Sequence, residues 1–111
     1  MTTKLPYVFL QVPLAHRALH DKEDHRPENS RAAIIAAISA GYGIEIDLQL
    51  SRDAQAMVFH DYGLDRLAKA KGAIRQKSSE ELADIGLIGG DEGVPTLPEV
   101  LDLVAGRVPL L

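Results

Sequence analysis

Hydrophobic and polar residues alternate most regularly between residues 43 and 50 of the chain. The aliphatic positions are Ile44, Ile46, Leu48 and Leu50, and the polar positions between them are Glu45, Asp47 and Gln49. Successive side chains of a strand point to opposite faces, so this segment is predicted to be a strand with one aliphatic and one polar face. Apolar runs at residues 9–15, 56–59 and 108–111 predict further strands, the last of them incomplete.

Helical patterns separate these strands. The segment Pro27–Ser30 is typical of a helix start, apolar residues then recur every three or four positions, and Gly41 and Gly43 mark the helix end. The segments Ser78–Glu81 and Thr96–Glu99 have the spacing of a capping box, in which a hydroxyl and a carboxylate bond reciprocally to the first turn. Each therefore predicts a shorter helix.

The order of the predicted elements is typical of an α/β fold. Strands and helices alternate, with an irregular loop that contains about one turn of helix at residues 62–77 and a glycine-rich loop at residues 88–94. Such alternation favours a sheet of mainly parallel strands. The chain has no repeat, low-complexity tract or linker, so residues 1–111 are predicted to form a single domain.

Composition narrows the possible functions. The chain is 46% hydrophobic, enough for a core, and its net charge of −4 argues against a general nucleic-acid binder. It has no cysteine, which excludes disulfides, thiolate metal sites and a cysteine nucleophile. The longest apolar run, Ala32–Ile38, is far below the roughly 18 residues of a membrane span, and residues 1–14 make a poor signal peptide. A cytoplasmic protein is expected.

The carboxylates of the strand at residues 43–50 have two interpretations. In an antiparallel sheet with one wet face, Glu45 and Asp47 would simply face solvent. A parallel sheet is covered on both faces, so the same side chains would point into a polar site at the end of the strand. They lie two residues apart, about 7 Å along a strand, which is close enough to bind one hard cation together.

Two histidines follow predicted strands in the same way. His16 ends the first strand and His60 follows the strand at residues 56–59, whereas His20 and His25 lie in a polar loop and are expected to be structural. Imidazole is neutral or protonated near pH 7, so one histidine can act as a base while the other protonates a leaving oxygen. Arg17 could bind a phosphate with its planar fork, although a lone arginine is more often a surface cation.

Six short motifs follow one another along the chain. They are His16-Arg17, Pro27-Glu28-Asn29, Glu45-Ile46-Asp47-Leu48-Gln49-Leu50, His60-Asp61, Leu64-Asp65-Arg66 and Pro95-Thr96-Leu97. In this order and at this spacing they resemble the N-terminal half of the glycerophosphodiester phosphodiesterase family, from about residue 14 onward.

The resemblance implies a TIM-type (β/α)8 barrel that hydrolyses glycerophosphodiesters, such as deacylated phospholipids, to glycerol phosphate and an alcohol. It implies a divalent cation, calcium or magnesium, as cofactor. By the same resemblance, His16 and His60 match the acid–base pair, Arg17 the phosphate-binding arginine, and Glu45 and Asp47 two metal ligands. Which histidine is the acid and which the base stays open.

Further residues match the family or depart from it. Glu28 and Asn29 match a segment next to the site and are expected to support and orient it, and Asp61 is expected to fix the strand end that carries His60. Ala18 and Ala54 stand where the family usually has glycine, and both departures are expected to be mild.

Length is the larger departure. A complete barrel takes about 250 residues, so the chain is expected to form its N-terminal part, truncated at about the fourth strand, before the family's third metal carboxylate. An open half-barrel exposes strand edges, and self-association is therefore expected. Two other functions stay open: a catalytically incomplete half-barrel that acts as a binding or assembly module, and a phospholipase D-like lipid hydrolase.

Overall fold

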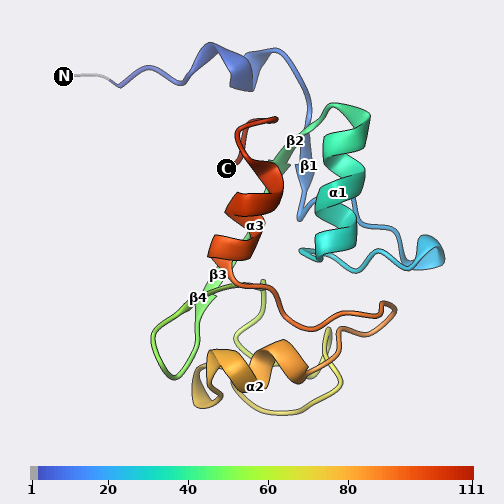
Figure 1. Cartoon of the computed structure of the whole chain (residues 1–111), viewed down its shortest axis with the longest axis vertical. Helices are drawn as coiled ribbons and strands as arrows, with labels where there is room; N and C mark the ends of the chain where they lie inside the picture. Colours follow the sequence, from blue (N-terminus) through green and yellow to red (C-terminus); the bar gives the residue numbers. More distant parts are fainter. Residues whose placement is uncertain (1–2) are drawn as a thin grey trace.

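A small parallel sheet organises the first half of the fold. The computed structural model describes residues 3–111, and Figure 1 shows them. Strands β1 (Leu14–His16) and β2 (Gly43–Glu45) pair in parallel, and Ile44 of β2 forms a parallel bridge to Leu110 on its other side. The predicted parallel arrangement is correct for these three segments, and β2 lies at their centre.

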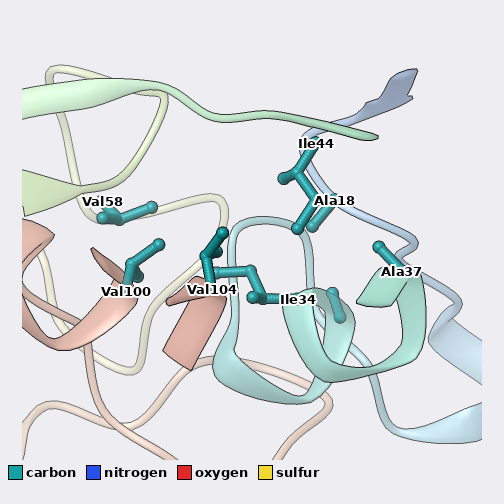
Figure 2. Packing of buried hydrophobic residues seen from close by; sticks show 8 residues of the cluster. Ala18, Ile34, Ala37, Ile44, Val58, Val100 and Val104 are labelled. Carbon is teal, nitrogen blue, oxygen red and sulfur yellow. The ribbon is translucent and has the colours of Figure 1, made fainter. Parts of the chain in front are cut away.

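Two helices pack against each other beside this sheet (Figure 1). Helix α1 (Arg31–Ala40) begins at Ser30, whose hydroxyl accepts a hydrogen bond from the Ala33 N–H, and ends at Gly41 in the left-handed conformation. Helix α3 (Leu97–Val104) begins with the predicted capping box of Thr96 and Glu99. We call β1, β2, α1 and α3 the sheet–helix region. Its buried cluster, shown in Figure 2, comprises Ala18, Ala33, Ile34, Ala37, Ile44, Val58, Val100 and Val104.

The predicted strand at residues 43–50 is broken, and its second half belongs to an antiparallel hairpin. Strand β3 (Leu48–Leu50) pairs with β4 (Ala56–Val58) across a tight turn. The expectation of mainly parallel strands is therefore wrong here, because a five-residue connection is too short for the crossover that parallel strands need. Leu48 and Leu50 are 48% and 45% exposed, so the aliphatic face is buried only in β2.

Residues 59–94, which we call the loop region, have little regular structure but a core of their own. The single predicted helical turn is a 3-10 helix at Ile74–Gln76, and the predicted capping box of Ser78 and Glu81 begins helix α2 (Ser79–Asp84). The buried residues of this second cluster are Met57, Phe59, Leu64, Ala68, Ile74, Leu82, Leu87 and Val94. Apolar side chains from successive turns thus replace a strand ladder as the organising contact.

Strand β4 joins the two clusters. Val58 packs into the cluster of the sheet–helix region, whereas its neighbours Met57 and Phe59 pack into the cluster of the loop region. All three are at most 1% exposed. Successive side chains of a strand point to opposite faces, so β4 lies between the two cores and contributes a buried side chain to each.

The predicted first strand at residues 9–15 is wrong in its first half. Tyr7–Leu10 form a 3-10 helix, and β1 begins only at Leu14. Pro13 has no N–H to donate to a strand ladder, although its carbonyl accepts a hydrogen bond from Gly43 at 2.9 Å, and this limits the strand to three residues. None of the helices within residues 3–111 has the length and apolar character needed to cross a membrane.

Candidate active site

The parallel register brings two of the predicted site residues together. His16 and Glu45 are the last residues of β1 and β2 and are paired directly across the ladder. His16 Nε2 lies 3.9 Å from Glu45 Oε2, and the same oxygen accepts a hydrogen bond from the backbone N–H of Arg17 at 3.0 Å. The sheet itself therefore places an imidazole and a carboxylate side by side at its carboxyl end.

The chain turns sharply after β1 through two left-handed residues. Arg17 and Ala18 have φ values of 57° and 64°, and the Ala18 N–H donates to the Glu45 carbonyl at 3.2 Å. Ala54, in the β3–β4 turn, has a φ of 60°. Both alanines that stand in for family glycines thus adopt a conformation that costs a non-glycine residue about 1–2 kcal/mol. The departures expected to be mild carry backbone strain.

Asn29 holds the second predicted metal ligand from two sides. Its amide Nδ2 donates to Asp47 Oδ2 at 3.1 Å, and its Oδ1 accepts from the Asp47 N–H at 3.3 Å. Asn29 is 2% exposed, left-handed with a φ of 58°, and tied to the Arg17 carbonyl through its own N–H at 2.8 Å. The side chain expected to orient the site thus bonds directly to Asp47.

Five side chains at this rim form a closed ring of hydrogen bonds. Arg17 donates to Glu28, Glu28 and Asp61 both accept from Arg66, and His60 bonds to Asp61 through one ring nitrogen and to Arg17 through the other. Around the ring these distances are 3.1 Å for Arg17–Glu28, 3.0 Å for Glu28–Arg66, 2.9 Å for Arg66–Asp61, 2.7 Å for Asp61–His60 and 3.1 Å for His60–Arg17. We call this arrangement the five-residue ring.

The ring determines which nitrogen of His60 carries the proton. A guanidinium can only donate, so Nε2 of His60, which faces Arg17 NH2, must accept with its lone pair. The proton of the neutral imidazole then lies on Nδ1 and donates to Asp61 Oδ1. Hydrogen bonds from Arg66 and then from His60 lower the pKa of Asp61 below its ordinary range, so this acceptor stays ionised. The lone pair of His60 Nε2 is thereby occupied by Arg17.

Glu45 and Asp47 offer oxygens suited to a hard divalent cation. One oxygen of each carboxylate accepts a hydrogen bond from an uncharged group: Glu45 Oε2 from the Arg17 N–H and Asp47 Oδ2 from the Asn29 amide. Within residues 3–111 no hydrogen bond is made to the second oxygen, Oε1 of Glu45 or Oδ1 of Asp47. The donor set fits calcium or magnesium, which prefer carboxylate oxygens. Over the same part of the chain, no group of three His, Cys, Asp or Glu side chains converges to hold a metal ion. Two carboxylates would leave most coordination positions to water or substrate.

Arg17 has an unused donor in this arrangement. Its Nε is buried and has no hydrogen-bond partner within the described residues, and Asp47 Oδ2 lies 3.9 Å away. A buried donor without a partner is costly, and a bound oxyanion would satisfy it. The arginine expected to bind phosphate thus has one N–H without an acceptor among the described residues.

The structure also adds two residues to those expected at the site. Arg66 closes the five-residue ring, and the Gln49 side chain donates to the His60 carbonyl at 2.9 Å. Gln49 shares the polar face that identified Glu45 and Asp47, so the alternation of the sequence contained a signal for it. Arg66 stands in one of the six motifs, but its spacing gave no indication of a role.

Comparison with known proteins identifies the family. Residues 16–109 match the model of the glycerophosphoryl diester phosphodiesterase family, and the chain therefore belongs to it. A glycerophosphodiester phosphodiesterase of Caldanaerobacter subterraneus subsp. tengcongensis is 35% identical, with 85% of this chain and 40% of that protein aligned. One from Bacillus altitudinis is 36% identical over 84% of this chain and 40% of its own length.

Solved structures show the same relationship. An Oleispira antarctica phosphodiesterase in complex with the product sn-glycerol-3-phosphate matches with a TM-score of 0.80 and 29% identity, covering 94% of this chain and 44% of that one. A glycerophosphodiester phosphodiesterase from Agrobacterium tumefaciens matches with a TM-score of 0.79 and 28% identity, over 89% and 45%. The chain thus spans less than half of these relatives, and its fold is consistent with part of their TIM barrel, as expected.

Proposed function

We propose that this chain carries the catalytic rim of a metal-dependent glycerophosphodiester phosphodiesterase. The reaction is hydrolysis of a glycerophosphodiester to glycerol phosphate and an alcohol. The observation that supports it best is the contact of Arg17 with His60, beside the carboxylates of Glu45 and Asp47. A cationic fork, a neutral imidazole and two hard oxygen ligands are the groups that hydrolysis of an anionic diester requires.

In this proposal Arg17 binds the non-bridging oxygens of the phosphate. Its buried Nε and its terminal nitrogens supply the donors. Their hydrogen bonds to the phosphate oxygens strengthen as negative charge builds in the transition state. Substrate binding then draws Arg17 NH2 away from His60 Nε2, which releases the imidazole lone pair. The substrate would thus activate the base that acts on it.

His60 is the proposed general base and His16 the general acid. His60 Nε2 takes a proton from the attacking water as its oxygen bonds to phosphorus, and Asp61 stabilises the resulting imidazolium through its hydrogen bond with Nδ1–H. His16 ends β1 opposite Glu45 of β2, and its side chain is 72% exposed. It gives a proton to the leaving alcohol oxygen as the bond from that oxygen to phosphorus breaks. After turnover His60 has gained a proton and His16 has lost one, and proton exchange with solvent water restores both.

Glu45 and Asp47 would hold the divalent cation, calcium or magnesium. When bound, it would neutralise phosphate charge and lower the pKa of a coordinated oxygen. Asn29 keeps the Asp47 carboxylate oriented through its amide, and the Arg17 backbone does the same for Glu45. With two carboxylates the site is expected to bind the cation weakly.

The test is release of glycerol phosphate from glycerophosphocholine by the 111-residue chain, with calcium or magnesium present. His60→Ala and His16→Ala should each abolish release, whereas His20→Ala, a matched change in the exposed loop, should leave it unchanged. Equal activity in all three variants would refute the acid–base pair. Calorimetric titration with each cation, on the parent and on Glu45→Gln, tests the metal site independently of turnover.

The alternative function is a binding or assembly module. It is supported by the coverage, because the chain spans less than half of the solved relatives described above. In that case the cation binds, Glu45→Gln weakens its binding, and no glycerol phosphate forms. Self-association belongs to the same question, since Leu48 and Leu50 expose an aliphatic strand face. Light scattering should then show an oligomer, which a Leu48→Ser/Leu50→Ser variant reduces to a monomer.

A further inference from the structure

Arg66 contacts both acids of the five-residue ring at once. Its Nε and NH2 donate to the two oxygens of Asp61, both at 2.9 Å, and its NH1 donates to Glu28 Oε1 at 3.0 Å. Each of these acids in turn bonds one member of the Arg17–His60 pair. Within residues 3–111 no hydrogen bond joins Arg66 to Arg17 or to His60, so its hydrogen-bonded route to them passes through the two carboxylates.

The geometry of these contacts is specific to arginine. A guanidinium presents several N–H groups in one rigid plane, and two parallel bonds to one carboxylate fix the rotation of that carboxylate. Lysine would place one point charge between the acids and leave their rotation free. The bidentate contact therefore orients the Asp61 oxygen that faces His60 Nδ1.

The backbone below Arg66 is anchored by the core of the loop region. Leu64 and Ala68 are 0% and 3% exposed, and the Ala68 N–H bonds to the Leu64 carbonyl at 2.8 Å. Arg66 lies between them on the outside of this turn, with a side chain 50% exposed. The buried neighbours thus fix the backbone position of Arg66, while its guanidinium forms hydrogen bonds within the five-residue ring.

Charges alternate around the ring. Two guanidiniums, of Arg17 and Arg66, face two carboxylates, of Glu28 and Asp61, so the ring balances with a neutral His60. Without Arg66, the charged groups sum to one excess negative charge and Asp61 has no cation at hydrogen-bonding distance. The Asp61 carboxylate would then turn toward solvent and lose its fixed contact with Nδ1.

We infer that Arg66 is a positioning residue. Through Asp61 it fixes the neutral form of His60 that is protonated at Nδ1, and through Glu28 it keeps Arg17 against Nε2 of the same ring. The inference rests on the proposed function only in what it adds to turnover, because the tautomer of His60 is a property of the resting chain.

The test is the nitrogen NMR spectrum of the four histidines at neutral pH in the 111-residue chain. The His60 signals, assigned with His60→Ala, should show a single tautomer with protonated Nδ1. In Arg66→Ala and Arg66→Lys they should shift to a mixture of both tautomers, and Asp61→Asn should do the same. Arg75→Ala, an exposed arginine for which no ion pair is seen within residues 3–111, is the matched control and should leave the spectrum unchanged.

An unchanged His60 tautomer in both Arg66 variants would overturn the inference, whatever the activity. In the release assay, the two Arg66 variants should lower kcat by about 10- to 100-fold, the usual range when a supporting contact of a site is lost. A shifted tautomer combined with full activity in His60→Ala would instead refute the proposed role of His60 and leave the positioning by Arg66 intact. Thermal unfolding should be nearly unchanged, because the Arg66 side chain is half-exposed.

Discussion

The sheet–helix region and the loop region supply opposite sides of the five-residue ring by different means. Arg17 and Glu28 are set by β1, its register with β2 and the start of α1. His60, Asp61 and Arg66 stand on turns whose backbone bonds connect distant loop segments, such as Leu64 N–H to the Gly72 carbonyl at 2.9 Å. Buried side chains hold the loops where a ladder holds the strands, so regular structure is not required to place a site residue.

The largest effects are expected when one buried side chain is truncated in each core in turn. Ile34→Ala in the sheet–helix region and Leu64→Ala in the loop region should each lower the free energy of unfolding by about 3 kcal/mol, since both side chains are fully buried. Because β4 joins the two clusters, either variant should speed amide exchange at both Ile44 and Leu82. Urea unfolding and hydrogen exchange measure the two effects.

Leu101→Ala is the control for the core variants, because Leu101 is 50% exposed and its loss should cost well under 1 kcal/mol. If Leu64→Ala left the Ile44 amide as protected as in the parent chain, the two regions would be separate folding units.

A contact between the regions should have the next largest effect. Glu92, from the loop region, accepts hydrogen bonds from the N–H groups of Arg31 and Ala32 at 2.7 and 3.2 Å, and pairs with the Arg31 guanidinium at 3.3 Å. It therefore caps helix α1 from outside the helix. Glu92→Ala should destabilise the chain by about 2 kcal/mol in urea unfolding, as expected for a lost charged cap.

The neighbouring Asp91→Ala changes an exposed acid of the same loop and should stay within about 0.5 kcal/mol of the parent. Equal stability of the Asp91 and Glu92 variants would mean that the contact does not connect the two regions energetically.

A smaller effect, of opposite sign, is expected at the strained turn of the hairpin. Ala54 is exposed and left-handed, so Ala54→Gly removes a conformational cost and should raise the free energy of unfolding by about 1 kcal/mol. Ala83→Gly, in helix α2, should lower it by a similar amount because glycine weakens a helix. Thermal unfolding of the two variants should therefore shift in opposite directions.

The smallest effect concerns acid. Asp53 accepts hydrogen bonds from the Ser51 hydroxyl and from the hydroxyl and N–H of Ser79, and these lower its pKa, tying the hairpin turn to α2. A lowered pKa in the folded chain adds stability above the unfolded value of about 4, and this is lost as pH falls below it. Asp53→Asn should therefore be less stable than the parent at pH 7, with a difference that shrinks below about pH 4.

Ser79→Ala removes one hydroxyl donor and keeps the N–H, so it should show a weaker version of the same pH dependence. A difference between parent and Asp53→Asn that stays constant from pH 7 to pH 2 would contradict the assignment.

The sequence predicted the sheet–helix region better than the rest. Capping residues such as Ser30 and Thr96 act within one helical turn, so their spacing is sufficient to predict the helices. The break after β2 was missed because the alternation of residues 43–50 continues through it, while the short return to β4 imposes antiparallel pairing. Pro13, which limits β1, was available as a signal.

Most residues of the candidate site could be named from the sequence, but their arrangement could not. Strand ends and motifs pointed to Arg17, Glu28, His60 and Asp61, yet the five-residue ring depends on contacts between positions up to 43 residues apart. The position of Arg66 depends on the burial of Leu64 and Ala68 on either side of it, and no local pattern encodes that packing.

The turn after β1 gives Arg17 two separate tasks, which substitutions can distinguish. Its backbone N–H holds Glu45 Oε2, whereas its guanidinium contacts Glu28 and His60. Replacement by glycine, which tolerates the left-handed φ of 57°, keeps the first contact and removes only the second. Loss of activity without loss of cation affinity at this position would therefore report on the guanidinium alone, and a proline would disable both tasks together.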